Sequence, residues 1–128
     1  MLSIGPEASV LDAVKMMAEK GVGALVVMDG EKLLGIVSER DYARKVILKG
    51  RASDDTPVRD IMTADVATTS SESTVSACMN QVTDRRIRHL PVVDDGRVTG
   101  VISIGDLVKA IIADQQEEIE QLGQYISG

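Results

Sequence analysis

Aromatic residues are nearly absent from this sequence, which has no tryptophan, no phenylalanine and two tyrosines. Single-stranded nucleic acids bind proteins largely by stacking their bases on aromatic side chains. An excess of positive charge, which would attract a phosphate backbone, is also lacking, because the formal net charge is −6. We therefore expect no nucleic-acid partner.

Cysteine and histidine occur once each, as Cys78 and His89. One cysteine cannot form an internal disulfide, and no cysteine–histidine cluster has the spacing of metal ligands. The sequence also pairs no nucleophile with a base. We expect no metal, no cofactor and no enzymatic activity, and we expect Cys78 to be a small buried apolar residue.

Long apolar runs are missing too. The longest, "GVGALVVM", is far too short to cross a bilayer, and no basic head followed by a long apolar stretch marks a signal peptide. These absences predict a cytoplasmic protein without membrane contact. With 128 residues, 44% of them hydrophobic and 27% charged, the chain has the composition of one compact globular domain.

The sequence repeats itself at a spacing of 65 residues, at which the two halves align without a gap. A unit of about 45 residues is too small to bury an adequate core alone, so the halves should pack on each other as an intramolecular pseudo-dimer. The identical pairs are Glu7 and Glu72, Val10 and Val75, Leu25 and Leu90, Val27 and Val92, Asp29 and Asp94, Gly35 and Gly100, Ser38 and Ser103, Asp41 and Asp106, and Ile47 and Ile112.

Both halves show the same predicted order of elements. In the first half we expect a helix capped by Ser9 and ending at Gly21. Two strands, "ALVVM" and "KLLGIV", follow around a turn at Asp29–Gly30, and Ser38 then opens a second helix that runs to about Lys49.

The second half repeats this order, with a helix over about 75–86, strands "LPVV" and "RVTGVI" and a helix from Ser103. The fold class is therefore α+β, a sandwich of helices and strands built from tandem β-α-β-β-α units. Between the halves, Thr56 should cap a short helical turn with Pro57 at its first position. That turn includes "VRDIM", whose counterpart would fall before residue 1, so the first half lacks a leading element, either trimmed or borrowed from elsewhere.

The last helix runs past its counterpart. Ile112, Ile119 and Ile126 are spaced by seven residues, with Leu122 on the same stripe, which is a pattern typical of a coiled coil. Gly123 weakens this helix. The stripe predicts either a tail folded onto its own domain or a homodimer contact.

These motifs in this order, "VRDIM", "RIRHLPVVD" and Gly–apolar–apolar–Ser–x–x–Asp, resemble the cystathionine-β-synthase (CBS) domain pair, in its small stand-alone bacterial form. The resemblance covers nearly the whole chain before the tail. It implies two CBS repeats, residues 1–50 (repeat 1) and 66–112 (repeat 2), joined by a connector over residues 51–65 and followed by a helical tail over residues 113–128.

Members of this family are usually regulatory modules that bind AMP, ADP, ATP or related adenosine compounds between their repeats. The resemblance implies that Asp41 and Asp106 hold ribose hydroxyls and that Ser38 and Ser103 approach phosphates. The same Ser–x–x–Asp pattern is also a capping box, in which serine and aspartate satisfy the free N–H groups at a helix start. The two roles are compatible, since a helix N-terminus with free N–H groups is an anion site.

A basic cluster precedes the second "LPVV"-type strand. Arg86, Arg88 and His89 lie where the resemblance implies contacts with ligand phosphates, whereas helix-terminus stabilisation and solvation are the alternative for the arginines. Arg40, beside Asp41, is replaced by Gly105 in the second half, so the two clefts cannot be equivalent.

We therefore expect one competent cleft, built from Ser38, Arg40 and Asp41 with cations from the other repeat. Its adenine would rest near residues 66–69, including Thr69, or near Ile4. The predicted function is regulatory sensing of an adenine nucleotide, and we expect a homodimer. The alternatives are a ligand-free dimerisation scaffold and a binder of S-adenosylmethionine or a dinucleotide.

Overall fold

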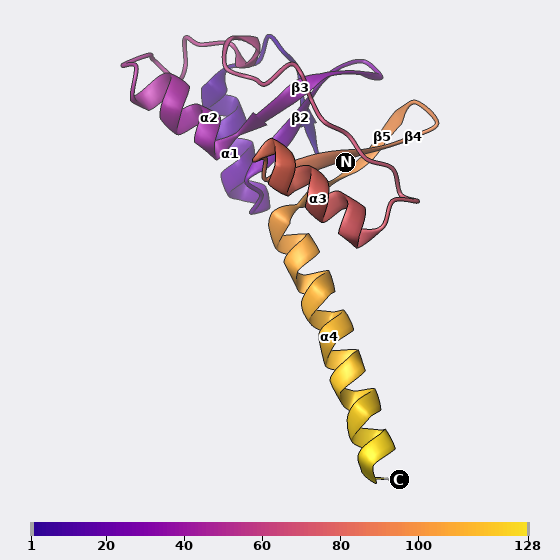
Figure 1. The fold of residues 1–128 in the computed structure, drawn as a ribbon. Coiled ribbons are helices and arrows are strands. Elements are labelled where there is room, and N and C mark those ends of the chain that lie inside the picture. Colours follow the sequence, from indigo (N-terminus) through magenta and orange to yellow (C-terminus); the bar gives the residue numbers. More distant parts are fainter. Residues whose placement is uncertain (1, 128) are drawn as a thin grey trace.

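The two halves form two small sheets that lie side by side, with helices packed against them (Figure 1). The structure is a computed structural model that describes residues 2–127, and the side chains of residues 2–115. The predicted α+β architecture is confirmed: both halves follow the order helix, strand, strand, helix, and each has a short extended segment before its first helix, β1 in the first half and the bridge at Thr69 in the second.

Repeat 1 carries a sheet of three strands in the order β1-β2-β3, in which β1 and β2 are parallel and β2 and β3 antiparallel. The predicted helix, hairpin and strands are all present. Its elements are β1 (Ser3–Ile4), α1 (Val10–Lys20), β2 (Ala24–Asp29), β3 (Lys32–Ser38), α2 (Glu39–Tyr42) and a π-helical turn η1 (Ala43–Ile47).

Repeat 2 carries a two-stranded antiparallel sheet of β4 and β5. Thr69 pairs with Val92 in parallel, and Ile4 pairs with Val27 in the same way 65 residues earlier, so the repeat spacing extends to the strand register. The connector before it contains the 3₁₀ turn η2 (Val58–Asp60), and the elements that follow are α3 (Val75–Arg85), β4 (His89–Asp94), β5 (Arg97–Ser103) and α4 (Ile104–Ser127), which continues into the tail.

The first helix of each repeat starts and ends in the same way. The Ser9 hydroxyl accepts a hydrogen bond from the Asp12 N–H at 3.1 Å, as predicted, and Thr74 caps α3 through the Ala77 N–H. α1 ends at Gly21 with φ of +65°, the left-handed conformation that glycine adopts without strain. At the equivalent position of α3, Arg86 adopts φ of +54°.

The second helix of repeat 1 differs from the expectation. A regular helix was predicted from Ser38 to about Lys49, but α2 is four residues long and η1 continues it as a π-helix. The Leu48 N–H bonds to the Ala43 carbonyl and the Arg51 N–H to the Val46 carbonyl, five residues back in each case. This wider turn lets the buried Val46 face the core while the chain turns into the connector.

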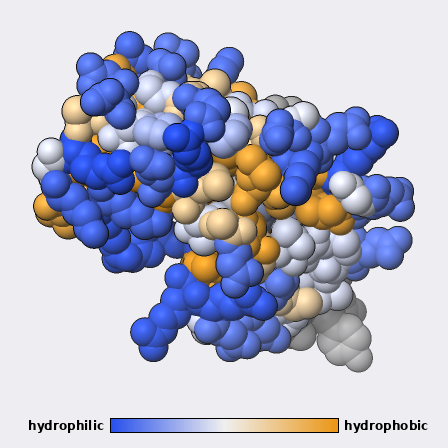
Figure 2. All heavy atoms as spheres, turned by 90° about the horizontal axis from the view of Figure 1, so that it is seen from above, coloured by the Kyte–Doolittle hydropathy of each residue, from blue (hydrophilic) through white to orange (hydrophobic). Residues whose placement is uncertain are grey.

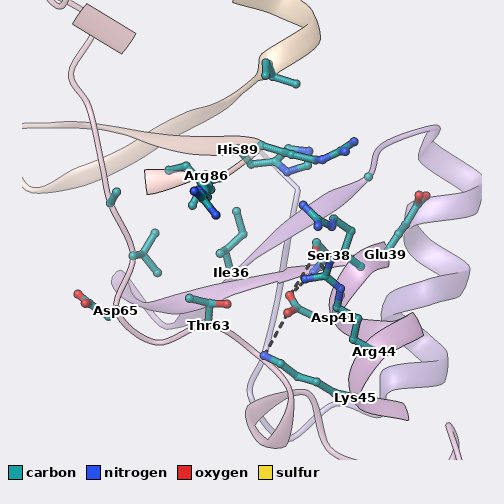
Figure 3. Close-up of a pocket in the computed structure, with 17 residues that line it drawn as sticks. Ile36, Ser38, Glu39, Asp41, Arg44, Lys45, Thr63, Asp65, Arg86 and His89 are labelled. Carbon is teal, nitrogen blue, oxygen red and sulfur yellow. Dashed lines mark hydrogen bonds and ion pairs between the residues drawn. The ribbon is translucent and has the colours of Figure 1, made fainter. Parts of the chain in front are cut away.

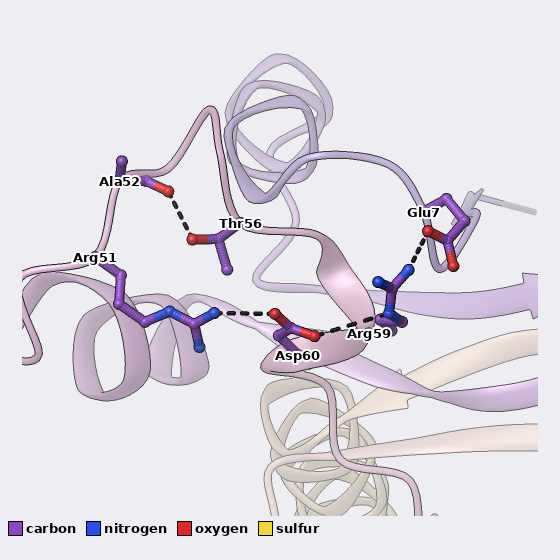
Figure 4. Close-up of polar contacts among 6 residues, drawn as sticks. All are labelled: Glu7, Arg51, Ala52, Thr56, Arg59 and Asp60. Atoms are coloured by element: carbon purple, nitrogen blue, oxygen red, sulfur yellow. Dashed lines mark hydrogen bonds and ion pairs between the residues drawn. The ribbon is translucent and has the colours of Figure 1, made fainter.

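The connector is tied to repeat 1 by polar contacts (Figure 4). Arg59 pairs with Glu7 of repeat 1, and within the connector Arg51 donates to Asp60 at 2.9 Å. The prediction that Thr56 caps the turn is wrong. Its hydroxyl instead donates to the Ala52 carbonyl at 2.6 Å, because the side chain is buried and turned back into the preceding loop.

Each repeat has its own hydrophobic cluster. The cluster of repeat 1 contains ten buried residues, among them Val58 and Ile61 of the connector. The cluster of repeat 2 contains four, Cys78, Val82, Leu90 and Leu107, so the expected burial of Cys78 is confirmed. The connector therefore completes the first core and not the second.

Helix α4 leaves the two sheets and extends away from them (Figure 1). We expected either a tail folded onto its own domain or a homodimer contact. The backbone of α4 does not bring its last turns back onto the domain, so the first of these expectations is not met. The stripe residues Ile119, Leu122 and Ile126 have side chains outside the described residues. Ile104, Val108 and Ile112, on the part that is described, are 37%, 41% and 48% exposed.

The surface is mostly hydrophilic on the face seen in Figure 2, with apolar residues gathered near its middle. Within the described part of the chain, no helix is both long enough and apolar enough to pass through a membrane.

Candidate functional site

A cleft of about 540 Å³ opens between the two repeats (Figure 3). Ser38, Asp41 and Lys45 reach it from the end of β3 and the helix that follows, and Arg86 and His89 reach it from the opposite side. The lining consists of Gly23, Ile36, Ser38, Glu39, Arg40, Asp41, Arg44, Lys45, Thr63, Asp65, Val66, Ala67, Arg86, Ile87, Arg88, His89 and Ile104.

Ser38 and Asp41 sit at the point where β3 becomes α2. Asp41 Oδ2 accepts from the Ser38 N–H and from the Ser38 hydroxyl, both at 3.0 Å, and the Asp41 N–H donates back to Ser38 Oγ at 3.2 Å. This is a reciprocal capping box, so the structural role considered for these residues is real. It also fixes the carboxylate at the mouth of the cleft.

Lys45 holds the other oxygen of that carboxylate. Its Nζ lies 3.1 Å from Asp41 Oδ1 and donates to the Ile61 carbonyl at 2.8 Å. Lys45 lies four residues after Asp41 and thus on the same face of the helix. The connector and the capping box are therefore linked through one ammonium group.

The opposite wall is basic because of how α3 ends. Arg86, in the left-handed conformation, turns the chain from α3 toward β4, and Arg88 and His89 follow as the chain enters β4. A non-glycine residue in this conformation is strained by about 1–2 kcal/mol. At the cost of this strain, repeat 2 has a guanidinium at the position where repeat 1 has the uncharged Gly21.

His89 lies half-buried in the cleft, and its ring would lie 3.6 Å from a Cβ at Gly23. Burial lowers the pKa of His89 below its ordinary value of 6.5, and the neighbouring Arg88 lowers it further, while Asp106 and Glu39 act in the opposite direction. The neutral imidazole is therefore favoured at neutral pH. An anion bound beside it would favour the protonated form.

The cleft is cationic in an acidic protein. Five cationic side chains line it, against three carboxylates, whereas the whole chain has a net charge of −6. Positive charges gathered in a cleft raise the local concentration of an anionic ligand. The arrangement can bind a phosphate group on the basic side and donors such as hydroxyls on the Asp41 side.

Of the predicted site residues, six line this cleft, and four do not. Ser103 and Asp106 form a second capping box at the start of α4, with 2.9 Å between the Ser103 N–H and Asp106 Oδ2. These hydrogen bonds, led by that from the Ser103 backbone, lower the pKa of Asp106. The six that do line it are Ser38, Arg40, Asp41, Arg86, Arg88 and His89.

Ile4 and Thr69, expected beside an adenine, do not line the cleft. Both are 8% exposed, because Ile4 lies on β1 and pairs with Val27 of β2, and Thr69 forms an equivalent bridge with Val92 of β4. The Thr69 hydroxyl is also within 3.4 Å of the sulfur of Cys78. Val66 and Ala67, from the same predicted segment, do line the cleft.

Sequence reasoning missed Thr63, Asp65 and Lys45 as lining residues. Thr63 and Asp65 belong to the connector, which had no counterpart in the first half to mark them. Lys45 could have been found from its spacing of four residues from Asp41. The described residues contain no cluster of three metal-ligating side chains.

Comparison with known proteins gives the same family for both halves. A family model described as "CBS domain" matches residues 1–48 and 58–113. A CBS-domain protein of Burkholderia ambifaria has a solved structure with a TM-score of 0.86 and 52% identity, over 90% of this chain and 85% of that one.

Two further relatives are larger than this chain. The mitochondrial CBS domain-containing protein CBSX3 of Arabidopsis thaliana is 46% identical over 125 residues, which is 94% of this chain and 61% of that protein. A CBS-CP12 protein of bloom-forming cyanobacteria, described as hexameric, has a TM-score of 0.77 and 31% identity over 84% of this chain and 64% of that one.

Proposed function

The chain belongs to the CBS-domain family, and on that premise we propose that it is a cytoplasmic regulatory module that binds an adenine nucleotide in the cleft between its repeats. The observation that carries this proposal is the division of the cleft wall. One side presents the Asp41 carboxylate at a helix start, and the other presents Arg86, Arg88 and His89.

The side that carries Asp41 suits a ribose. A carboxylate has about four acceptor positions, and Asp41 uses three of them for the Ser38 N–H, the Ser38 hydroxyl and Lys45. The hydroxyl hydrogen of Ser38 can rotate away from Asp41 Oδ2 while Ser38 Oγ still accepts from the Asp41 N–H. Two positions then become available to the two hydroxyls of a ribose.

The basic side suits phosphates. Arginine binds phosphate through paired N–H groups. Arg86 and Arg88 line this side of the cleft, and Arg40 lines it from the Asp41 side. The base would rest on the aliphatic and backbone groups of Ile36, Val66 and Ala67, which are also lining residues. Binding would stabilise, by mass action, the arrangement of the two repeats that binds the ligand better. The population of that arrangement would then depend on the ligand concentration.

A thermal-shift panel of AMP, ADP, ATP, S-adenosylmethionine and NADH tests this proposal on the wild type, Asp41→Ala and Asp106→Ala. Both aspartates form equivalent capping boxes, so both variants lose about 1 kcal/mol of stability. Only Asp41 lines the cleft. We expect a nucleotide-dependent rise of the melting temperature in the wild type and Asp106→Ala, and its loss in Asp41→Ala. An equal rise in all three proteins would refute the ribose assignment.

Self-association is a second proposed property, favoured by the exposed stripe on α4. Ile104, Val108 and Ile112 are spaced by four residues and form one apolar helix face. We propose that a second copy covers this face in a homodimer. Light scattering coupled to size exclusion should show a dimer for the wild type and a monomer for Val108→Asp; a wild-type monomer would contradict it. If the dimer forms and no compound in the panel binds, the ligand-free scaffold is the better account.

A further inference from the structure

An edge of the repeat 1 sheet is occupied by the connector. The backbone of Ile36, on β3, exchanges two hydrogen bonds with Thr63, with N···O distances of 3.0 and 2.8 Å. Gly35 beside it is in close contact with the same segment, because a Cβ there would lie 2.5 Å from the Thr63 carbonyl oxygen. Glycine is thus required at position 35 by the connector backbone that lies against it.

The equivalent edge of repeat 2 is open. Gly100 occupies the position of Gly35, yet a Cβ there would meet no atom of the described chain within 4 Å. Val101 faces Pro91 across the hairpin as Ile36 faces Val26, so its N–H and C=O point outward from the sheet in the same way. Among residues 2–115, no segment lies on this edge as Thr63 lies on the other.

The core beneath the open edge is correspondingly less covered. Val10, Val37 and Val46 in repeat 1 are at most 1% exposed and share a cluster with Val58 and Ile61 of the connector. Their counterparts in repeat 2, Val75, Ile102 and Ile111, are all partly exposed. The higher exposure in repeat 2 is expected if no segment covers this edge, because the connector buries the equivalent residues of repeat 1.

We propose that the β5 edge at Gly100–Val101 is a docking site for an extended peptide segment that has the chemistry of residues 58–63. Such a segment carries a valine and an isoleucine three residues apart, which enter the core, followed by a residue that pairs with Val101 through its backbone. Strand addition to a sheet edge is a general mode of peptide binding, in which the main chain supplies affinity and the side-chain pockets supply specificity.

The repeat also indicates where the segment arrives. Thr63 precedes Thr69 by the short stretch 64–68, and the counterpart of Thr69 is Ile4. A segment equivalent to the connector would therefore run beside the N-terminal end of the chain. A peptide with the sequence of residues 57–65, "PVRDIMTAD", placed directly before Met1, would keep the 65-residue spacing and put its threonine opposite Val101.

A labelled peptide of this sequence tests the proposal by fluorescence anisotropy with the chain as it is. We expect saturable binding, weakened at least roughly tenfold, or by about 1.4 kcal/mol, in the Gly100→Ala variant, whose methyl group would meet the peptide backbone. A control peptide with aspartate in place of its isoleucine should not bind. Absence of binding by the folded wild type, or equal binding by Gly100→Ala, would overturn the proposal.

Joining the same peptide before Met1 gives an independent measurement. The fusion should melt at a higher temperature than the unmodified chain, and the Val101 amide should become protected from hydrogen exchange. Both effects should disappear when Gly100→Ala is added. If instead the unmodified chain is a dimer that Gly100→Ala converts to a monomer, and neither form of the peptide has an effect, then a second copy occupies the edge and the proposal is wrong.

Discussion

Substituting alanine at Gly35 and at Gly100 separates two positions that the sequence makes identical. At Gly35 the new methyl group would lie 2.5 Å from the Thr63 carbonyl oxygen and 3.1 Å from the sulfur of Met62. Backbone must then move, and the two Ile36–Thr63 hydrogen bonds are strained or lost. Two hydrogen bonds contribute about 2 kcal/mol, and overpacking adds at least about 1 kcal/mol.

We therefore expect Gly35→Ala to lower the free energy of unfolding by about 3 kcal/mol, which for a chain of this size is a fall of roughly 10 °C in melting temperature. Gly100→Ala should leave stability unchanged or raise it by about 0.5–1 kcal/mol, because glycine within a strand is unfavourable and no described atom obstructs the methyl group. Urea unfolding of both variants and the wild type measures the difference. Equal losses in the two variants would refute the asymmetry between the repeats.

Three further substitutions give distinct outcomes. His89→Gln should remove part of the pH dependence of stability: since the pKa of His89 is lowered in the folded chain, the unfolded chain takes up its proton first, and stability falls as pH drops through 6.5 toward the folded pKa. Melting temperatures from pH 8 to 5 should therefore fall more steeply for the wild type, and parallel curves would contradict this. Arg86→Gly should raise stability by about 1 kcal/mol in chemical denaturation, because glycine relieves the left-handed strain, while weakening binding of ATP; a loss of stability would show that the conformation is unstrained. Thr56→Val should cost about 1–2 kcal/mol because the Ala52 carbonyl loses its donor, and an unchanged urea midpoint would show that this hydrogen bond contributes nothing.

Most of the fold was predictable because the same sequence pattern occurs in both halves of the chain. Ser9, Gly21 and the turn at Asp29–Gly30 are local signals. The 65-residue repeat supplies a similar signal for two of them, at Thr74 and at the turn from Asp94, whereas the counterpart of Gly21 is Arg86. The π-helical turn at η1 was not predictable, since it depends on burying Val46 while the chain enters the connector. Thr56 was misassigned because a serine or threonine before proline is a cap signal only when its side chain faces the helix.

The site was predictable on the side where motifs repeat and less so elsewhere. Ser38 and Asp41 could be identified from Ser–x–x–Asp, and the structure shows that this pattern serves as a cap in both halves, so only tertiary packing distinguishes Asp41 from Asp106. Asp65 lies in an unrepeated connector and carried no local signal. Thr69 was predicted beside the adenine but is buried by its pairing with Val92, which depends on strand register.

The most direct test of the nucleotide proposal is a titration of the ¹⁵N-labelled chain with ATP, followed by amide chemical shifts. We predict saturable changes confined mainly to Ser38–Asp41 and Arg86–His89, the two walls of one cleft, and small changes at Ser103–Asp106. Saturable changes centred on Ser103–Asp106 with none at Ser38–Asp41, or no change at millimolar ATP, would contradict it.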